Sequence, residues 1–269
     1  MKRFIKIAKS SKIYIFSLIF IAILVFVSLI APLLPIDPAA TDVANLSQSP
    51  SLQHLFGTDE VGRDYYGGRI SLIVGLLAMV TAVTIGTIVG LIAGYVGGVV
   101  DSLLMRLVDV LSSIPWLVLV IVLSVFLKPG IGSIIIVIGC FSWMRLARLV
   151  RVETLSAKEY DYVVYSRFSG VKTISILKKH IIPAIIPTLV VAASASIANA
   201  IMTEAALSFL GLGIQQPMTS WGTLLQNAQQ SLQRAPHMAI IPGLFVMLTI
   251  YSFNNIGNLL TKYIQKEGE

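Results

Sequence analysis

Long apolar runs divide the chain into intervals that carry no charge. Six such intervals cover residues 13–36, 70–100, 110–127, 129–144, 181–203 and 238–261. A helix needs about 20 residues to cross the hydrocarbon core of a bilayer. The fourth interval is short, but arginine side chains at a helix end can reach the interface, which lets this span extend to about Leu149. The pattern predicts an all-α integral membrane protein with six transmembrane helices.

The first interval could be mistaken for a secretory signal, because Lys2, Arg3, Lys6, Lys9 and Lys12 precede it. A signal has an apolar region of roughly 7 to 15 residues followed by a small-residue cleavage site. The uncharged interval 13–36 is longer than that and no such site follows it. We therefore expect it to remain as a helix.

Composition supports a membrane location, since 56% of the residues are hydrophobic and only 12% are charged. Six spans place both termini on one side, and the opposite side then receives only Arg63, Arg69, Lys128 and Arg234 of the twenty lysines and arginines. Cytoplasmic loops are enriched in these residues. The count predicts cytoplasmic N and C termini, and this topology accounts for the net charge of +7 without a nucleic-acid partner.

Two loops are larger than a connection requires, and such loops often carry function. Residues 1–69 are expected to form a cytoplasmic tail, the first helix and an external loop, and residues 70–269 a five-helix core with a cytoplasmic loop at 150–183. The external loop holds Asp59, Arg63, Asp64 and Arg69, whose opposite charges can form an ion-paired turn.

Glycines recur at every fourth position of the second span, at Gly86, Gly90, Gly94 and Gly98. Such a stripe of small residues lets a neighbouring helix approach closely, and a hinge is the alternative interpretation.

Charged residues and a helix-breaking proline mark the start of the third span. Arg106 and Asp109 have the spacing of an intrahelical ion pair. Pro115 is expected to kink the span near Ser112 and Ser113, whose hydroxyls can bind the freed carbonyls.

The cytoplasmic loop mixes basic and apolar residues at helical intervals, with Gly170 in the middle. We expect two short helices joined at this glycine. Ile174, Leu177 and Ile181 form an apolar stripe on the second helix, and the prolines at 183 and 187 should mark a turn into the fifth span. The residues alone leave open whether this stripe lies on the membrane surface or docks into a partner protein.

This loop resembles the coupling loop of binding-protein-dependent ABC importer permeases, in which a glycine precedes a proline by the interval that separates Gly170 from Pro183. The ending from Lys179 to Pro183, the run from Asp161 to Val163, and Arg167 are similar to the peptide and nickel branch. Tyr165 and Ser166 stand where that family usually has two alanines, and Val164 replaces its acidic residue.

Two further stretches are similar to the second, smaller permease of the same branch. One runs from Gly57 to Leu72, although its interval between Asp64 and Arg69 is shorter than the branch pattern. The other runs from Glu204 to Gly213.

The resemblance implies the fold of type I ABC importer permeases, a location in the bacterial inner membrane, and import of dipeptides, oligopeptides, nickel or metal chelates by alternating access. It also implies a heterodimer with a related permease, two ATP-binding subunits, and an extracellular or periplasmic solute-binding protein. ATP and Mg would be used by those partners, and this chain would bind no cofactor. It assigns ATPase coupling to Asp161, Tyr162, Arg167, Gly170, Ile174, Leu177, His180 and Pro183. The chain has no Gly-x-x-x-x-Gly-Lys-Ser/Thr phosphate loop, in agreement with this non-catalytic role.

Polar residues of the fifth span are candidates for the translocation pathway, because such groups rarely face lipid. Ser196, Asn199 and Thr203 share one helix face, with Glu204 beside them. The serine could instead pack against a neighbouring helix, and Glu204 could instead pair with Arg63 or Arg69 as a gate or a structural tie.

Two other classes of protein are less well supported. An ion-coupled secondary transporter would normally show mid-span acidic residues and an inverted repeat, and the sequence has neither. An intramembrane enzyme is disfavoured because His54, His180 and His237 lie far apart and no metal-ligand spacing is present. The lone Cys140 indicates no chemistry.

Overall fold

The computed structural model describes residues 2–30, 45–51, 57–58, 68–127, 130–216 and 218–265. Its elements are helices: α1 Lys2–Ala8, α2 Lys12–Ile30, α3 Gly68–Val96, α4 Gly98–Ser113, α5 Trp116–Phe126, α6 Ile131–Ala157, α7 Asp161–Phe168, α8 Thr173–Ile176, the π-helix η3 Leu177–Ile181, α9 Ile182–Phe209, α10 Trp221–Ser231 and α11 His237–Gln265.

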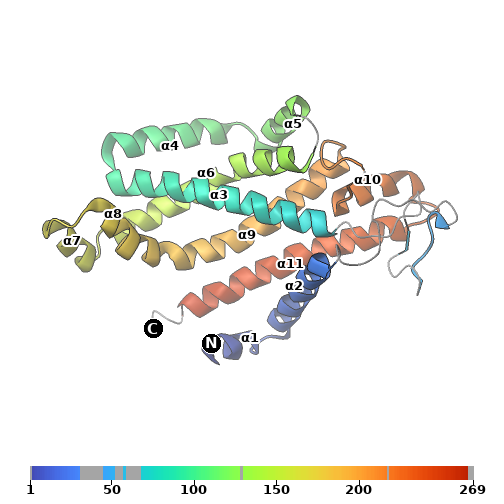
Figure 1. The fold of residues 1–269 in the computed structure, drawn as a ribbon, viewed down its shortest axis with the longest axis horizontal. Helices are drawn as coiled ribbons and strands as arrows, with labels where there is room; N and C mark the ends of the chain where they lie inside the picture. The colour runs from blue at the N-terminus through green and yellow to red at the C-terminus, as the bar shows by residue number, and fades with distance from the viewer. Residues whose placement is uncertain are drawn as a thin grey trace.

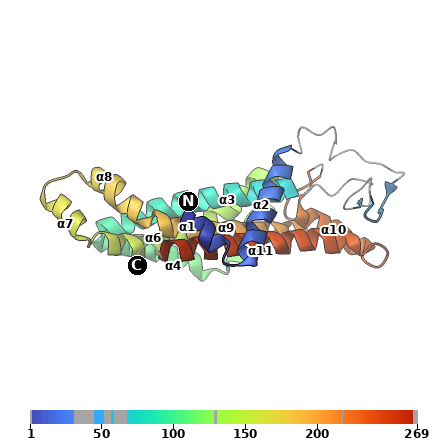
Figure 2. The same ribbon diagram turned by 90° about the horizontal axis from the view of Figure 1, so that it is seen from below.

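The long helices run side by side along one axis of an elongated molecule (Figure 1). Helices α7 and α8 lie at one extremity and α10 lies at the other, and the view turned by 90° keeps them apart in the same way (Figure 2). We call these extremities the α7 end and the α10 end. Helix α9 runs from the first to the second and so connects them.

Five helices are long and apolar enough to cross a membrane: Lys12–Ile30, Gly68–Val96, Ile131–Ala157, Thr173–Phe209 and His237–Ile264. They coincide with the first, second, fourth, fifth and sixth intervals of the apolar pattern. The chain is therefore a multi-pass membrane protein.

The third apolar interval, 110–127, does not form one long helix. Helix α4 ends at Ser113, Ile114 is extended with φ −80° and ψ 129°, and α5 starts after Pro115. A residue before proline is driven out of the helical region, and proline has no N–H to donate. The Ser113 hydroxyl donates to the carbonyl of Val110 at 2.7 Å, as expected for a helix end at this proline.

The second interval also ends earlier than its apolar pattern suggests. Helix α3 stops at Val96, and Gly97 and Gly98 adopt φ values of +70° and +56° that turn the chain into α4. Gly98 thus lies outside the predicted glycine stripe, and a Cβ there would meet nothing within 4 Å. Positive φ at this turn is the reason for glycine.

The other three glycines of the stripe lie against α6. A Cβ on Gly86, Gly90 or Gly94 would come within 2.6 to 2.8 Å of atoms of α6, backbone carbonyl oxygens among them. Only glycine permits this separation, and α3 and α6 form the most extensive helix contact among the described residues.

The helix that follows η3 corrects another expectation. Pro183 and Pro187 do not mark a turn, since α8, η3 and α9 run on as one helix from Thr173 to Phe209. In η3 the N–H of Ile182 bonds the carbonyl of Leu177, five residues back. This wider turn shifts the hydrogen-bond register just ahead of Pro183 and so accommodates a ring that an ordinary helix interior would reject.

Buried apolar clusters fill the bundle along its length. One joins α3, α5, α6 and α9, a second joins α9, α10 and α11, and a third joins α3, α4 and α6. At the α7 end, Val150, Ala157, Val163, Ile176 and Ile181 pack together with Ile185. This last cluster fixes the two short helices to the bundle.

Candidate functional site

A helical hairpin projects from the α7 end and contains the residues that sequence resemblance assigns to coupling, except Pro183, which lies in the first turn of α9. Helix α7 stops at Gly170, whose φ is +75°. The N–H of Val171 bonds the carbonyl of Ser166 and the N–H of Gly170 bonds that of Arg167, both at 3.1 Å. This is the Schellman pattern, which closes a helix on a left-handed glycine. We call residues 158–181 the hairpin segment.

The inner face of the hairpin segment is apolar and buried. Val163 of α7 and Ile176 of α8 are almost fully covered, and Ile181 is completely covered. The predicted apolar stripe of Ile174, Leu177 and Ile181 is therefore wrong as a single surface, because Ile181 faces the bundle while Ile174 is 60% exposed. Leu177 lies between the two and packs on the buried cluster.

The outer face carries large apolar side chains that contact little else in the chain. Tyr165 is 74% exposed and Phe168 81% exposed, and Val171 and Ile174 are also exposed. These four residues flank Gly170 in the sequence, and we call them the apolar tip. Exposed apolar groups of this size on a short rigid hairpin indicate a surface for a partner.

Basic and acidic residues border the apolar tip. Asp161 is in the first turn of α7 and Arg167 is in its last turn, so both charges interact favourably with the helix dipole. Arg167 and the lysines at 172, 178 and 179 are exposed. The tip is thus apolar at its centre and mainly basic at its rim.

An aromatic group links α7 to η3. The ring of Tyr162 lies 5.5 Å from the ring of Tyr160 and 5.5 Å from that of His180, measured between centroids. The Ser166 hydroxyl lies 3.4 Å from Nε2 of His180. Partial burial raises the pKa of Tyr162, with a smaller contribution from Tyr160, so its hydroxyl stays neutral at physiological pH. The structure thus brings together Tyr162 and His180, two of the predicted coupling residues.

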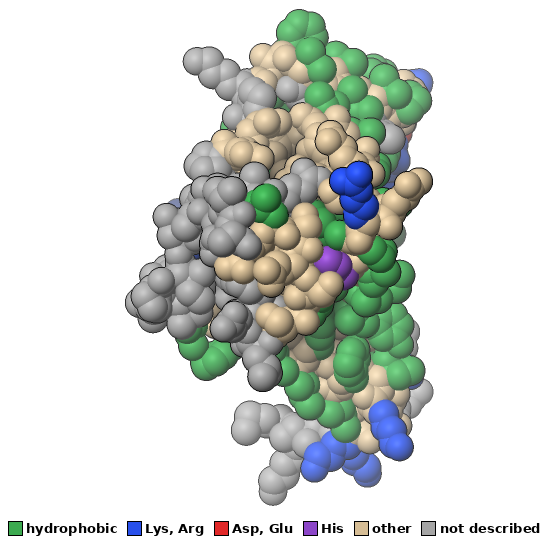
Figure 3. Space-filling model, turned by 90° about the vertical axis from the view of Figure 1, so that its right-hand side faces the viewer, with side chains coloured by type: hydrophobic (Ala, Val, Ile, Leu, Met, Phe, Trp, Pro, Cys, Tyr) green, Lys and Arg blue, Asp and Glu red, His purple; other side chains and the backbone are tan. Residues whose placement is uncertain are grey.

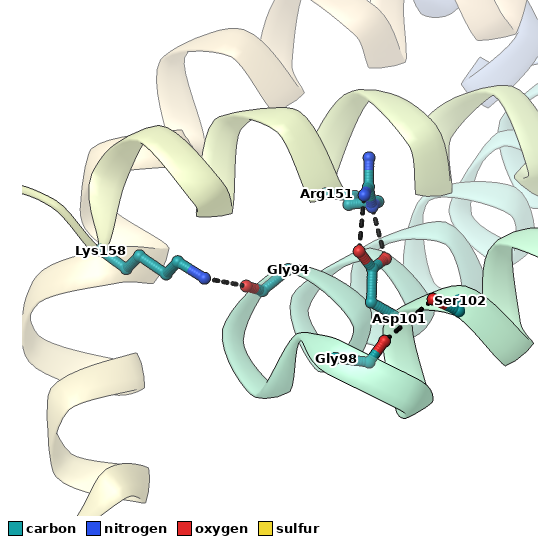
Figure 4. Close-up of polar contacts among 6 residues, drawn as sticks. All are labelled: Gly94, Gly98, Asp101, Ser102, Arg151 and Lys158. Carbon is teal, nitrogen blue, oxygen red and sulfur yellow. Dashed lines mark hydrogen bonds and ion pairs between the residues drawn. The ribbon is translucent and has the colours of Figure 1, made fainter.

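A polar brace supports the base of the hairpin segment (Figure 4). Arg151 of α6 binds both carboxylate oxygens of Asp101 in the first turn of α4. Lys158, just after α6, donates to the carbonyl of Gly94 at 3.2 Å. Together these bonds tie the turn between α3 and α4 to the end of α6 from which α7 departs.

A second ion pair corrects the expected one within α4. Nη2 of Arg148 lies 2.8 Å from Oδ1 of Asp109, so Asp109 pairs with α6 and not with Arg106 of its own helix. Both of these side chains are largely exposed, in contrast to the brace.

The predicted pathway residues of α9 divide between different environments. Ser196 donates to the carbonyl of Ala192 in its own helix, Asn199 is exposed, and Thr203 is buried. Glu204 has no exposed surface and accepts hydrogen bonds from Ser71 and Ser208. Among the described residues Glu204 is thus tied to serines and not to Arg69, while Arg63, the other predicted partner, lies outside them. Asn199 remains available to a solute on the exposed face of α9.

Most of the predicted external cluster lies outside the described residues, namely Asp59, Arg63 and Asp64. Arg69 is the second residue of α3 and is exposed. Nearby, Nε2 of His237 lies 3.0 Å from the carbonyl oxygen of Gln48, which joins residues 45–51 to the start of α11.

No group of three histidine, cysteine, aspartate or glutamate side chains in the described part of the chain could hold a metal ion.

Sequence reasoning missed the apolar tip, the brace and the serine partners of Glu204. Only the tip had a local signal, because Tyr165 and Phe168 follow a helix pattern whose inner face is already supplied by Val163. The other two depend on residues that meet across 50 and 133 positions of sequence.

Comparisons with known proteins agree with this geometry. Residues 86–267 match the family described as binding-protein-dependent transport system inner membrane component, and residues 1–50 match the N-terminal transmembrane domain of oligopeptide transport permease C.

Individual relatives match over most of the chain. It is 37% identical to the oligopeptide transport system permease protein OppC of Bacillus subtilis, over 93% of this chain and 84% of the relative. It is 41% identical to the protein of that name from Haemophilus influenzae, over 92% of this chain and 82% of the relative. Identity to the glutathione transport system permease protein GsiD of Escherichia coli is 40%, over 81% of this chain and 73% of the relative.

Proposed function

Because the chain belongs to the family of binding-protein-dependent transport system inner membrane components, we propose that it forms half of a translocation pathway for peptides. It is a permease subunit of an ATP-driven importer and not itself an enzyme, since ATP hydrolysis takes place in partner subunits. The other half of the pathway is a related permease. Two ATP-binding subunits and an external solute-binding protein complete the importer, which resides in the bacterial cell membrane.

The proposed topology has six crossings with the α7 end in the cytoplasm. Helices α4 and α5 together lead from the α7 end back to the start of α6 (Figure 1). At 1.5 Å per residue, 16 and 11 residues rise about 24 and 16 Å, which suffices for one broken crossing. The basic residues of α6 and the hairpin segment then lie on the cytoplasmic side, as the positive-inside rule requires. Both termini are cytoplasmic in this arrangement.

The observation that carries the proposal is the apolar tip. Phe168 and Tyr165 are among the most exposed large side chains of the molecule, yet they lie beyond the long apolar helices, where lipid would not cover them. An aromatic group of this kind, rimmed by Arg167 and lysines, has the composition of a binding hot spot. Its occupant in the importer is a cleft of the ATP-binding subunit. Rigid-body movement of that subunit would reach the bundle through the buried face of the hairpin segment and through the brace.

Peptides are the proposed cargo because the relatives are named for the transport of oligopeptides or glutathione. Asn199 is the best-placed pathway residue of α9. This chain needs no cofactor in this role, and ATP and Mg act on the partner subunits. Uptake of a labelled tripeptide, compared with uptake of nickel, by cells with and without the intact chain distinguishes the two cargo classes of the branch.

The substitution Phe168→Asp tests the docking role. It replaces the most exposed aromatic ring of the apolar tip with a carboxylate. Because the rest of the chain covers little of Phe168, the permease should still fold. We expect the amount of ATP-binding subunit that co-purifies to fall by about tenfold or more, since truncation of a hot-spot residue costs about 2 kcal/mol or more.

Leu232→Asp is the matched control, because Leu232 is another exposed apolar residue but follows α10 at the opposite end. Equal co-purification from Phe168→Asp and the parent chain would refute docking at the apolar tip. Uptake that continues with no ATP-binding subunit bound would instead favour an ion-coupled secondary transporter.

A further inference from the structure

Glu204 near the end of α9 is a carboxylate with no exposed surface and no cation bound to it within the described residues. Its Oε1 accepts a hydrogen bond from the hydroxyl of Ser208 at 2.8 Å, and its Oε2 accepts one from the hydroxyl of Ser71 at 2.9 Å. Taking a carboxylate out of water is costly unless its oxygens are hydrogen-bonded. We call Glu204, Ser71 and Ser208 the serine cage.

Each serine of the cage also receives a backbone N–H. The N–H of Ile214 donates to Oγ of Ser208, and the N–H of Trp221 donates to Oγ of Ser71, both at 3.1 Å. A serine hydroxyl has one hydrogen to donate. Because that hydrogen points to Glu204, the oxygen is free to accept the backbone N–H. The carboxylate thus orients two chains of hydrogen bonds, which we call relays. One runs from the N–H of Ile214 through the Ser208 hydroxyl to Glu204, and the other runs from the N–H of Trp221 through the Ser71 hydroxyl to Glu204.

The two relays organise the chain that joins α9 to α10. Ile214 lies within the connector of residues 210–220, and Trp221 is the first residue of α10. Ser220 begins α10 with a capping box, in which its hydroxyl accepts the N–H of Thr223 and the hydroxyl of Thr223 accepts the N–H of Ser220. Ile214 of the connector and Trp221 at the start of α10 are therefore both linked to the one carboxylate through the two serines.

Two glycines allow these elements to approach the cage. A Cβ on Gly213 would lie 2.0 Å from Oγ of Ser208, and a Cβ on Gly222 would lie 2.6 Å from the carbonyl oxygen of Ala205. Neither position has room for a side chain. The run from Glu204 to Gly213, which stands out as a motif in the sequence, is thereby accounted for as one packed structure.

The serine cage is attached to the same helix that leaves the hairpin segment. Residues 173–209 form one continuous helix, and 37 residues at 1.5 Å each span about 55 Å. Its first turn carries Ile174 of the apolar tip, and its last two turns carry Glu204. Figure 3 looks onto the α10 end, where uncharged polar side chains and backbone occupy much of the described centre and hydrophobic side chains lie on the flank.

We propose that Glu204 is a positioning residue of the transport cycle. It holds α10 and the connector, together with the start of α3, as one rigid external unit on α9. Docking of the solute-binding protein on the outside then moves α9 as a rod and reaches the hairpin segment. This role rests on the proposed importer function, although the cage itself does not.

Hydrogen exchange in the complete importer tests the cage. In Glu204→Gln, one carboxylate oxygen becomes an NH₂ group that cannot accept a hydroxyl hydrogen, so one serine loses the acceptor that orients its hydroxyl. We expect the amide of Ile214 or Trp221 to exchange about tenfold faster or more. Ser208→Ala should accelerate Ile214 alone, and Ser71→Ala should accelerate Trp221 alone.

Ser194→Ala is the matched control, because Ser194 is buried in the same helix but donates only to the carbonyl of Val191. It should leave both amides unchanged. The serine variants keep the test decisive if Glu204→Gln fails to assemble. Unchanged exchange in both serine variants would overturn the cage.

The functional arm measures ATP hydrolysis with and without solute-loaded binding protein, and uptake of a labelled tripeptide. In Glu204→Gln we expect basal ATP hydrolysis within about twofold of the parent chain. We expect stimulation of hydrolysis by the binding protein to fall about fivefold or more, and uptake to fall with it. A proportional loss of basal and stimulated hydrolysis would show a merely structural role and overturn the positioning role of Glu204. Normal stimulation of hydrolysis despite faster amide exchange would also overturn it. An intact parent chain that associates with no ATPase would refute the proposed function, while the exchange results would still report on the cage.

Discussion

The two ends of α9 are built on opposite principles. At the α7 end large apolar side chains are exposed and the short helices turn through open space at Gly170. At the α10 end a carboxylate and several hydroxyls are buried, and the glycines lie in contact with neighbouring atoms. An end that exposes apolar surface is incomplete until a partner covers it. An end that buries a satisfied polar network specifies one arrangement of its own elements.

The glycines of the two ends show this difference most directly. Gly170 has a positive φ, and a Cβ added to it would meet nothing within 4 Å, so backbone conformation alone requires glycine there. Gly213 has no positive φ, but a Cβ would fall within 2.4 Å of both Oγ and Cα of Ser208. Space alone requires glycine at that position. Substitutions at the two sites should therefore fail for different reasons.

The largest effect should come from Gly213→Ala. The atoms in its way include Cα and N of Ser208, so relief requires a backbone shift within the serine cage. Overpacking of this kind typically costs 1 to 3 kcal/mol, and we expect about 3 kcal/mol here. Thermal unfolding of the purified importer, together with its amount in the membrane, measures the loss.

Gly132→Ala provides the control for that substitution. Gly132 lies in the first turn of α6, and a Cβ there would meet nothing within 4 Å. Alanine also has the higher helix propensity, so stability should be unchanged or slightly improved. If Gly213→Ala were as stable as Gly132→Ala, the tight packing of the α10 end would be contradicted.

An intermediate effect should separate the two ion pairs near the α7 end. Arg151 and Asp101 have side chains 30% and 14% exposed, whereas Arg148 and Asp109 are 47% and 62% exposed. A bidentate, partly buried bond to a charged group contributes about 1.5 to 3 kcal/mol. An exposed pair contributes about 1 kcal/mol or less.

We therefore expect Arg151→Ala to lower stability by about 2 kcal/mol and Arg148→Ala by less than about 1 kcal/mol. Double-mutant cycles with Asp101→Asn and Asp109→Asn measure each pair separately. Equal coupling energies for both pairs would show that the brace holds α4 to α6 no more firmly than a surface contact does.

Local pattern was sufficient for some of this fold. Apolar length identified the five spans, Pro115 located the break between α4 and α5, and glycine spacing identified Gly86, Gly90 and Gly94 as a helix-packing surface, whose partner α6 only the structure shows. Each of these depends on residues close together in sequence. Gly98 has the same spacing, but it follows Gly97, and the pair turns the chain.

Other features were out of reach for a physical reason. The stripe of Ile174, Leu177 and Ile181 assumes a regular α-helix, and η3 changes the rotation per residue between its members. Ile181 is thereby turned inward while Ile174 stays outside. Glu204 could be singled out as a charge in a span, but Ser71 lies 133 positions away, so only the folded chain shows what the carboxylate holds.

The smallest effect should come from exchanging Gly170 for a residue that tolerates its backbone conformation. Asparagine visits the left-handed region far more readily than alanine, which is disfavoured there by about 1 to 2 kcal/mol. Gly170→Ala should therefore weaken the hydrogen bond from the N–H of Val171 to the carbonyl of Ser166, which closes the C-terminus of α7. A loss of about 1 kcal/mol corresponds to about fivefold faster hydrogen exchange of the Val171 amide. Gly170→Asn should leave that exchange nearly unchanged, because no atom of the chain lies within 4 Å of the new Cβ. Equal acceleration by both substitutions would mean that crowding matters at Gly170, and the contrast between a turn set by conformation and a cage set by packing would then be lost.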